Sequence, residues 1–273
     1  MAVFHFKHFD VSNERSAMKV NTDGVLLGAA ADVLPTDRNV LDIGTGTGTV
    51  ALMIAQRLSL LGEDFLIDAI DIDLPSAEEA SANFAGSPWK DHLTACRTGL
   101  ASFGTDRRYD LILSNPPYFD SSLKAPEARR NSARHVADPL TDPGIEPLSF
   151  REVLEYSEMT LRPGGRVCLV LPSDLEKQLL RHAAMCGFFP WKTLRVKTVA
   201  RKEPSRLVVQ FQKGRSLSAR VTLLGDLALR CGGTVEIHRP QWGLEGLYTV
   251  TAHEHRWEKG LFTTSLSLEG IHT

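Results

Sequence analysis

The residues best suited to chemistry are the tetrad Asn115-Pro116-Pro117-Tyr118, which combines an amide, two rigid prolines and an aromatic ring. Proline fixes φ and disfavours helix at the preceding residue, so Asn115 is pushed to an extended backbone that holds its carboxamide. The tetrad follows the apolar run 109–114, which predicts a buried strand, so it stands at a strand's carboxyl end, where open α/β sheets bind ligands. An amide oxygen beside an aromatic ring can grip a flat substrate that carries an amino group.

A second candidate lies upstream in the run 40–48, where a short apolar strand leads into Gly44, Gly46 and Gly48 and then into an apolar helical pattern. Glycines let the backbone turn tightly and approach a ligand, and the first turn of a helix offers free amide protons. The spacing is G-x-G-x-G, whereas G-x-G-x-x-G seats a pyrophosphate, and Asp42 precedes the first glycine. These features favour a cationic, nucleotide-like cofactor without phosphates.

An acidic strand end supports the same cofactor. Asp71 follows a strand predicted over 65–70, and a carboxylate there can accept hydrogen bonds from two ribose hydroxyls. S-adenosyl-L-methionine fits these observations. Simpler readings stay open: the glycines could form a plain tight turn, Asp71 a solvated strand end or a helix cap, and the tetrad an ordinary turn. Asp73 fits better as the cap of a helix that begins near Pro75.

The ordered motifs D-I-G-T-G-T-G, D-I-D and S-N-P-P-Y-F resemble those of class I methyltransferases that modify amino groups. The opening segments F-K-H-F at 6–9 and A-M-K-V-N-T-D-G-V-L-L-G-A at 17–29 are similar to the bacterial tRNA1(Val) (adenine-37 N6)-methyltransferase family, and the similarity extends to about residue 214. The resemblance implies an α/β, Rossmann-like fold with a seven-stranded, mostly parallel sheet and a C-terminal antiparallel hairpin. It also implies S-adenosyl-L-methionine as cofactor and tRNA as partner.

Residue chemistry and resemblance together assign two sets of site residues. The expected catalytic residues are Asn115, Pro116, Pro117 and Tyr118. The expected cofactor-binding residues are Thr22, Asp23, Asp42, Gly44, Thr45, Gly46, Gly48, Asp71, Ile72, Gly99, Leu100 and Asn115.

The sequence departs from the family pattern in three places. Asn21 stands where a glycine is usual, and the third predicted strand ends in Gly99-Leu100, where related enzymes often present an acid to the cofactor's adenine amino group. A neighbouring backbone carbonyl or Ser102 replaces that contact, or cofactor affinity is lower by one hydrogen bond, about 1 kcal/mol. Residues beyond about 215 match no family ending that we identify.

Length and composition favour one large α/β domain, since the chain has 273 residues and is 42% hydrophobic. We expect an N-terminal segment (1–30) that closes over the cofactor and substrate site, a methyltransferase domain (31–214) and a C-terminal extension (215–273).

The sequence shows neither an apolar run long enough to span a membrane nor a secretory leader, and four cysteines lack C-x-x-C spacing. We therefore expect a cytoplasmic monomer with reduced thiols and no bound metal.

A net charge of −2 argues against strong nonspecific nucleic-acid binding, so contact with RNA must come from local patches. The segment 120–146 is long, polar and proline-bearing, and we interpret it as a substrate loop that orders over RNA, although a tether without function is the alternative. Each cation alone could be a solvated surface residue. The predicted RNA-binding residues are Lys7, Lys19, Phe119, Arg129, Arg130, Arg134, Lys197, Arg201, Lys202 and Arg206.

The later chain predicts a helix over 148–161, a strand over 166–171, a helix over 174–186 and strands over 192–199 and 206–212. In the extension, the pattern suggests a helix over 219–231 and strands over 234–238 and 247–252.

The expected mechanism is methyl transfer to the exocyclic amine of adenine. The side-chain oxygen of Asn115 and the backbone carbonyl of Pro116 would accept the two N6 hydrogens and aim the nitrogen lone pair at the methyl group, while Tyr118 stacks on the base. Extraction of an unpaired loop base costs little. Rival substrates are a guanine in ribosomal RNA and a protein glutamine amide, since both present a planar nitrogen. A catalytically silent RNA-binding protein is the third possibility, favoured only by Gly99.

Overall fold

The computed structural model describes residues 3–62, 64–104, 106–117, 148–214, 218–224, 234–239, 244–258 and 261–271. The chain divides into two compact units, Met1–Gln212 and Lys213–Thr273. Across the described ranges, no helix is both long and apolar enough to cross a bilayer.

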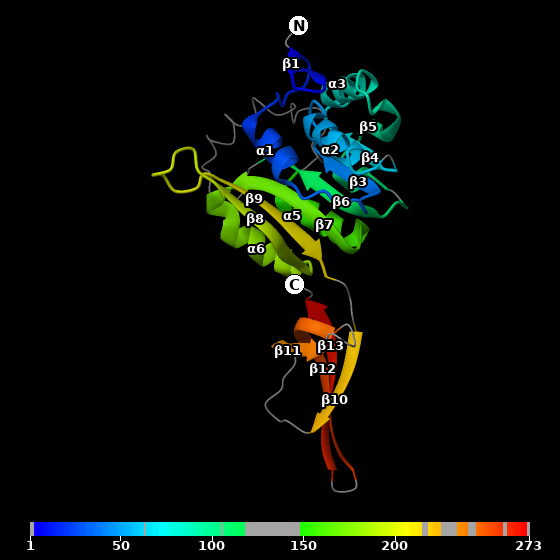
Figure 1. Cartoon of the computed structure of the whole chain (residues 1–273), viewed down its shortest axis with the longest axis vertical. Coiled ribbons are helices and arrows are strands. Elements are labelled where there is room, and N and C mark those ends of the chain that lie inside the picture. Colours follow the sequence, from blue (N-terminus) through cyan, green and yellow to red (C-terminus); the bar gives the residue numbers. More distant parts are fainter. Residues whose placement is uncertain are drawn as a thin grey trace. The chain divides into compact units, whose positions relative to one another are not determined.

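The first unit is built on a seven-stranded sheet with the strand order β5-β4-β3-β6-β7-β9-β8 (Figure 1). The first five strands in this order pair in parallel, and β9 pairs antiparallel with β7. The predicted sheet, mostly parallel with a C-terminal hairpin, is therefore confirmed. The strands are β3 (Asn39–Ile43), β4 (Leu66–Asp71), β5 (Leu93–Arg97), β6 (Tyr109–Ser114), β7 (Leu161–Pro172), β8 (Phe188–Val196) and β9 (Arg206–Lys213).

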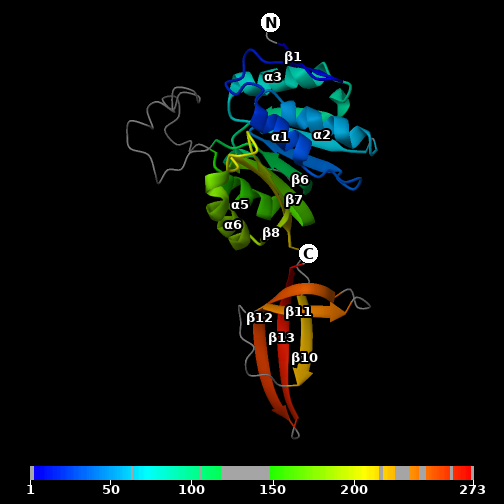
Figure 2. The same cartoon turned by 60° about the vertical axis from the view of Figure 1, so that its left-hand side comes forward.

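Helices cover both faces of this sheet, and both views show the same two groups (Figures 1 and 2). One group contains α1 (Thr22–Ala30), α2 (Thr49–Ser59) and α3 (Leu74–Ala85), and the other contains α5 (Phe150–Thr160) and α6 (Glu176–Met185). Short 3₁₀ turns occur at Lys90–His92 (η1), Leu100–Ser102 (η2) and Ser173–Leu175 (η3). A small hairpin of β1 (Val3–His5) and β2 (Asp10–Ser12) precedes α1.

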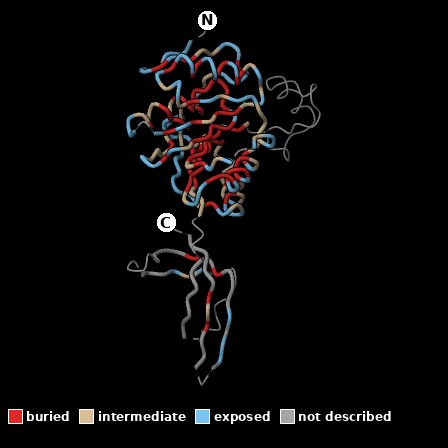
Figure 3. The backbone as a smooth tube through the Cα atoms, turned by 90° about the vertical axis from the view of Figure 1, so that its right-hand side faces the viewer, coloured by how far each residue is buried: buried red, intermediate tan, exposed pale blue. Residues whose placement is uncertain are grey.

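Two apolar cores follow from the alternation of side chains along the strands. On β3, Val40 belongs to the core beneath α1, α2 and α3, whereas Leu41 belongs to the core beneath α5 and α6. Leu113 and Ile112 on β6 divide in the same way. Figure 3 shows the buried residues concentrated along the middle of this unit. Burial on both faces explains why the strands are continuous apolar runs.

Local caps fix where the helices begin. Asp73 caps α3 and accepts a hydrogen bond from the Ser76 backbone N–H at 3.0 Å, which confirms its predicted role. Asn21, which replaces the usual family glycine, caps α1 by accepting from the Gly24 N–H at 2.8 Å. The substitution therefore supplies a cap of the type that helices prefer.

The second unit is a four-stranded antiparallel sheet with the order β10-β13-β12-β11. Its strands are β10 (Ser218–Leu224), β11 (Thr234–Arg239), β12 (Leu244–Glu258) and β13 (Leu261–Ile271). The strands predicted over 234–238 and 247–252 are confirmed.

The predicted helix over 219–231 is wrong for its first part, because 218–224 form β10; residues 225–231 lie outside the described residues. Ala219, Val221 and Leu223 alternate with Arg220 and Thr222. That alternation has the period of a strand, and pairing with β13 along seven residues outweighs the helix propensity of alanine and leucine.

Candidate active site

Four neighbouring parallel strands end beside one another at the edge where the predicted site residues lie. In register, Asp71 pairs with Arg97, Ile43 with Ile70 and Ser114 with Ile43. The residues that follow these strand ends are Gly99, Asp73, Gly44 and Asn115, in the spatial order β5, β4, β3 and β6. From β3 the chain continues to β4 and β5 on one side, whereas β6 and β7 lie on the other side of β3. The boundary between β3 and β6 is therefore the topological switch point of the sheet, where such folds bind ligands.

The glycine loop after β3 needs its glycines, since Gly44, Gly46 and Gly48 have φ values of 72°, 57° and 79°. L-residues with a side chain rarely adopt this left-handed region. The loop is tied to β4, because the N–H groups of Gly44 and Thr45 both donate to the Ile70 carbonyl, at 2.9 and 3.0 Å. The backbone thus approaches the site without side chains in the way.

Asp42, the residue two positions before Gly44, is buried beside this loop and only 1% exposed. Its carboxylate accepts a 2.7 Å hydrogen bond from the Thr45 hydroxyl and another from the Ala51 N–H in the first turns of α2. Burial, together with the smaller effect of the neighbouring Asp71 charge, raises the pKa of Asp42 to about 7, against the hydrogen bonds from Thr45 and Ala51, which lower it. Asp42 therefore holds the shape of the loop.

Asp71 links the glycine loop to the start of α3. Its Oδ2 accepts from the Gly46 N–H at 2.8 Å and its Oδ1 from the Asp73 N–H at 2.9 Å. Burial raises the pKa of Asp71, hydrogen bonds from the Asp73 and Gly46 N–H groups counter it, and the charge of Asp73 adds to the rise. A carboxylate has about four acceptor sites, so after the N–H groups of Gly46, Asp73 and Ile72 it can still accept from a further donor.

The adjacent strand end, beyond β5, carries no acid, as the sequence indicated. Ile72 is 41% exposed, and a Cβ built at Gly99 would lie 3.4 Å from its Cδ1, so these two residues form one small apolar surface. The Gly99 carbonyl already accepts from the Ser102 N–H at 3.0 Å and from the Thr98 hydroxyl at 3.2 Å. Leu100 is half-buried beside the second core.

The Asn-Pro-Pro segment leaves the sheet directly beside the glycine loop. The Ser114 hydroxyl donates to the Ile43 carbonyl at 2.8 Å and so fastens the end of β6 to the end of β3. Asn115 and Pro117 are half-buried and Pro116 is buried. The remaining predicted residues of this region, Tyr118, Phe119, Arg129, Arg130 and Arg134, lie outside the described residues.

The predicted residues of the opening segment have separate positions. Thr22 is exposed at the first position of α1. Asp23 forms an ion pair with Arg206 at the start of β9, and the Arg206 Nε lies 2.9 Å from both carboxylate oxygens. The structure therefore joins a residue predicted to bind cofactor to one predicted to bind RNA.

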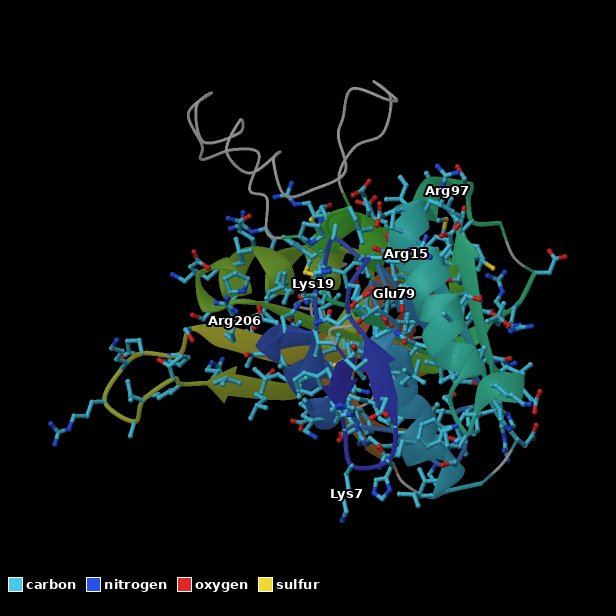
Figure 4. The ribbon with its side chains drawn as sticks, turned by 90° about the horizontal axis from the view of Figure 1, so that it is seen from above. Lys7, Arg15, Lys19, Glu79, Arg97 and Arg206 are labelled. Atoms are coloured by element: carbon cyan, nitrogen blue, oxygen red, sulfur yellow. The ribbon has the colours of Figure 1, made fainter. Side chains whose placement is uncertain are left out.

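The remaining predicted cations differ in how far they are tied to the protein. The Lys19 Nζ donates to the Glu14 carbonyl at 2.6 Å. Lys7 is exposed between β1 and β2, and Figure 4 shows it well apart from Lys19 and Arg206. Exposed cations also occupy the connection between β8 and β9, namely Lys197, Arg201 and Lys202.

Two buried polar residues of α3, Glu79 and Asn83, were missed by the sequence reasoning. They bind the backbone of residues 12–16 and of Thr47. A signal was present: Ser76, Glu79 and Asn83 recur at helical spacing on the face that the apolar pattern buries. A polar stripe on a buried helix face indicates a specific partner.

Comparison with known proteins identifies the family. The model of the methyltransferase small domain matches residues 16–145. A tRNA1(Val) (adenine(37)-N6)-methyltransferase of Phocaeicola vulgatus is 39% identical over 209 residues, which cover 77% of this chain and 83% of that protein. The chain belongs to the tRNA1(Val) (adenine(37)-N6)-methyltransferase family.

A second relative and a solved structure are also similar to this chain. A protein of the same name from Parabacteroides distasonis is 40% identical over 210 residues, covering 76% of this chain and 82% of that protein. Among solved structures, TrmN from Thermus thermophilus is similar with a TM-score of 0.47 and 24% identity, covering 73% of this chain and 50% of that one.

As a methyltransferase of this family, the protein uses S-adenosyl-L-methionine, which supplies an electrophilic methyl group on a positively charged sulfur. The residues present fit such a cofactor. Two backbone segments meet at Asp71 with a carboxylate acceptor site to spare, the three left-handed glycines of the loop present no side chains, and Ile72 offers an exposed apolar surface beside Gly99. Asp71 would hold the ribose and Ile72 would cover one face of the adenine.

Proposed function

We propose that the protein methylates the exocyclic N6 of an adenine in tRNA, namely adenosine 37 in the anticodon loop of tRNA1(Val). The observation that carries this proposal is the position of Asn115, which follows β6 at the switch point and is fastened by Ser114 to the end of the strand that leads into the glycine loop. An amide acceptor next to a cofactor loop suits an amine substrate. The names of the relatives support the choice of tRNA.

Adenine N6 is a poor nucleophile because its lone pair is delocalised into the ring. In our proposal the side-chain oxygen of Asn115 and the carbonyl of Pro116 accept the two N6 hydrogens. Those hydrogen bonds favour a tetrahedral nitrogen whose lone pair points at the methyl group, and Tyr118 stacks on the base. Since alignment of two reactants can contribute about 7 to 11 kcal/mol to catalysis, positioning by this segment supplies much of the rate.

The connection between β8 and β9, residues 197–205, is our candidate for the phosphate-binding arm. Lys197, Arg201 and Lys202 are exposed there, and no ion pair engages them within the described ranges. Arg206, at the end of the same connection, is instead neutralised by Asp23. Three unpaired cations on an exposed arm suit contact with the sugar-phosphate backbone, which gives affinity without sequence information.

The test is incubation of the purified protein with methyl-labelled S-adenosyl-L-methionine and total tRNA from a strain that lacks its gene, followed by digestion to nucleosides. The expected product is N6-methyladenosine in valine tRNA. Label in another nucleoside would refute the substrate and keep the chemistry. Absence of label from tRNA, together with transfer to ribosomal RNA or to a protein glutamine, would refute the proposal in favour of a rival substrate.

A further inference from the structure

Glu79 on α3 binds the backbone of an N-terminal strap, residues 12–18, which crosses from β2 towards α1. The Glu79 side chain belongs to a residue only 2% exposed, and its Oε1 accepts from the N–H groups of Glu14 and Arg15 at 2.7 and 2.9 Å. Its Oε2 accepts from the Ser16 N–H at 2.8 Å. Figure 4 shows Glu79 beside Arg15, where the strap runs along α3. One carboxylate thus holds three successive amides.

Asn83, one turn further along α3, joins the strap to the glycine loop. Its Oδ1 accepts from the Ser12 N–H at 2.8 Å, while its Nδ2 donates to the Ser12 carbonyl at 3.0 Å and to the Thr47 carbonyl at 2.8 Å. Thr47 lies between two glycines of the loop. The same helix face therefore fixes the strap and the loop relative to each other.

The far end of the strap lies directly over the glycine loop. A Cβ built at Gly46 would lie 3.4 Å from the Met18 carbonyl oxygen, 3.5 Å from the Met18 Cβ and 3.7 Å from the Ser16 Oγ. The Ser16 hydroxyl contacts the Ser76 hydroxyl at 2.8 Å and donates to the Met18 carbonyl at 3.0 Å. Gly46 is also the residue whose N–H binds Asp71. The position of the strap therefore determines how much space is open above Gly46, the central glycine of the loop.

Charge makes Glu79 a strong holder of the strap. Burial by itself would raise the pKa of Glu79, but the hydrogen bonds from Arg15, Ser16 and Glu14 outweigh burial and lower it. Hydrogen bonds that an ionised acceptor receives are roughly twice as strong as neutral ones. A surface glutamate on an exposed helix face would have no such partners.

We propose that Glu79 is a positioning residue that holds the N-terminal strap over the glycine loop and so sets the affinity for the cofactor. This inference depends on the function proposed above only in that the glycine loop is the cofactor site. Glu79 itself touches neither cofactor nor substrate, since its oxygens are occupied by the strap. The expected signature is weaker cofactor binding with little change in the chemical step.

The test compares Glu79→Ala and Glu79→Gln with a matched control, Glu78→Ala, which changes the adjacent exposed glutamate that pairs with the Arg15 side chain. Calorimetric titration with S-adenosylhomocysteine, which cannot donate a methyl group, measures affinity without turnover. Loss of the charged acceptor should weaken binding about 10- to 100-fold in Glu79→Ala. Glu79→Gln should lose less, because its one oxygen can still accept from Glu14 and Arg15. The control should stay within about twofold, the usual scale of a surface ion pair.

Two further measurements separate this role from a purely structural one. At saturating cofactor, kcat of Glu79→Ala should stay near the wild-type value while KM for the cofactor rises. Hydrogen exchange should accelerate at the amides of residues 14–16, which also gives a reading in the glutamine variant if Glu79→Ala fails to fold. Unchanged affinity for S-adenosylhomocysteine in Glu79→Ala, or a fall in kcat at constant affinity, would overturn the inference.

The outcomes also distinguish this inference from the proposed function. If the wild type binds S-adenosylhomocysteine and methylates no tRNA, the substrate proposal fails and the Glu79 comparison still decides the inference. If the wild type binds no S-adenosylhomocysteine, the inference is overturned with it.

Discussion

Replacement of Asp42 by asparagine should remove a large part of the pH dependence of folding stability. Asp42 is 1% exposed, and burial raises the pKa of its carboxyl group from 3.8 to about 7. A raised pKa means that the folded state binds the proton more tightly than the unfolded state does. The stability that this proton contributes is fully present below about pH 4 and is lost as the pH rises through about 7.

The magnitude follows from the shift. A difference of about three units between the folded and unfolded pKa, at about 1.4 kcal/mol per unit, corresponds to about 4 kcal/mol of stability between about pH 4 and pH 7. Between pH 5 and pH 7 the wild type should therefore lose about 2 kcal/mol relative to Asp42→Asn, which is neutral throughout. Asparagine can keep both contacts, since its oxygen can accept from the Ala51 N–H while its amide donates to the Thr45 hydroxyl.

The assay is urea unfolding of both proteins at pH 5, 6, 7 and 8, with the free energy of unfolding plotted as wild type minus variant. The exposed Asp91→Asn, in η1, serves as the control for the loss of a surface carboxyl group. A flat difference for Asp42→Asn would refute the reasoning, because it would mean that Asp42 ionises in the folded protein as readily as in the unfolded chain.

Three further predictions concern the site. Asn115→Ala should lower kcat by about 10²- to 10³-fold and leave the dissociation constant of S-adenosylhomocysteine unchanged, as measured by methyl transfer and calorimetry; an equal loss of both would contradict the role of Asn115. Asp71→Asn should weaken cofactor binding about 10- to 100-fold, and wild-type affinity in this variant would exclude Asp71 as the ribose ligand. The logarithm of the tRNA association constant falls as the logarithm of the salt concentration rises. Neutralising the β8–β9 arm should make this slope shallower by about 2 to 3, because each phosphate contact contributes about 0.7 to 0.9 to its magnitude. An unchanged slope would remove the arm from the RNA interface, and exposed Lys90→Gln is the control. The arm variant combines Lys197→Gln, Arg201→Gln and Lys202→Gln.

Much of the sheet and the order of its strand ends could be predicted from the sequence. Apolar runs that end in Gly44, Asp71 and Asn115 have the signature of buried parallel strands, and ligands gather where such strands end. The glycines were predictive because their left-handed φ values exclude most other residues. Asp73 was identified as a cap because it stands two positions before Pro75, and proline is favoured in the first turn of a helix.

Long-range polar pairs could not be predicted. Arg206 looks like a surface cation in the sequence, yet Asp23, which neutralises it, is 183 positions away. Glu79 resembles its exposed neighbour Glu78, and only the fold decides which of the two faces the strap. The prediction for the extension failed for a different reason. A short alternating segment such as 218–224 carries both strand and helix signals, and its partners in β13 lie 39 to 51 positions later.

The distance along the sequence between Asp23 and Arg206 also determines how late their ion pair can form during synthesis of the protein. A ribosome that adds about 5 to 20 residues per second needs about 10 to 40 s to travel from one partner to the other. Glu79 and Asn83 follow their partners among residues 12–16 by only 63 to 71 positions, so those contacts become possible much sooner. The α1 helix can pack early as well, because the Arg57 side chain on α2 donates to the Gly28 carbonyl at 2.8 Å. The carboxylate of Asp23, by contrast, must wait for Arg206 at the start of β9, which enters the sheet between β7 and β8. The N-terminal strap is therefore fastened early in synthesis, and the ion pair of Asp23 forms much later.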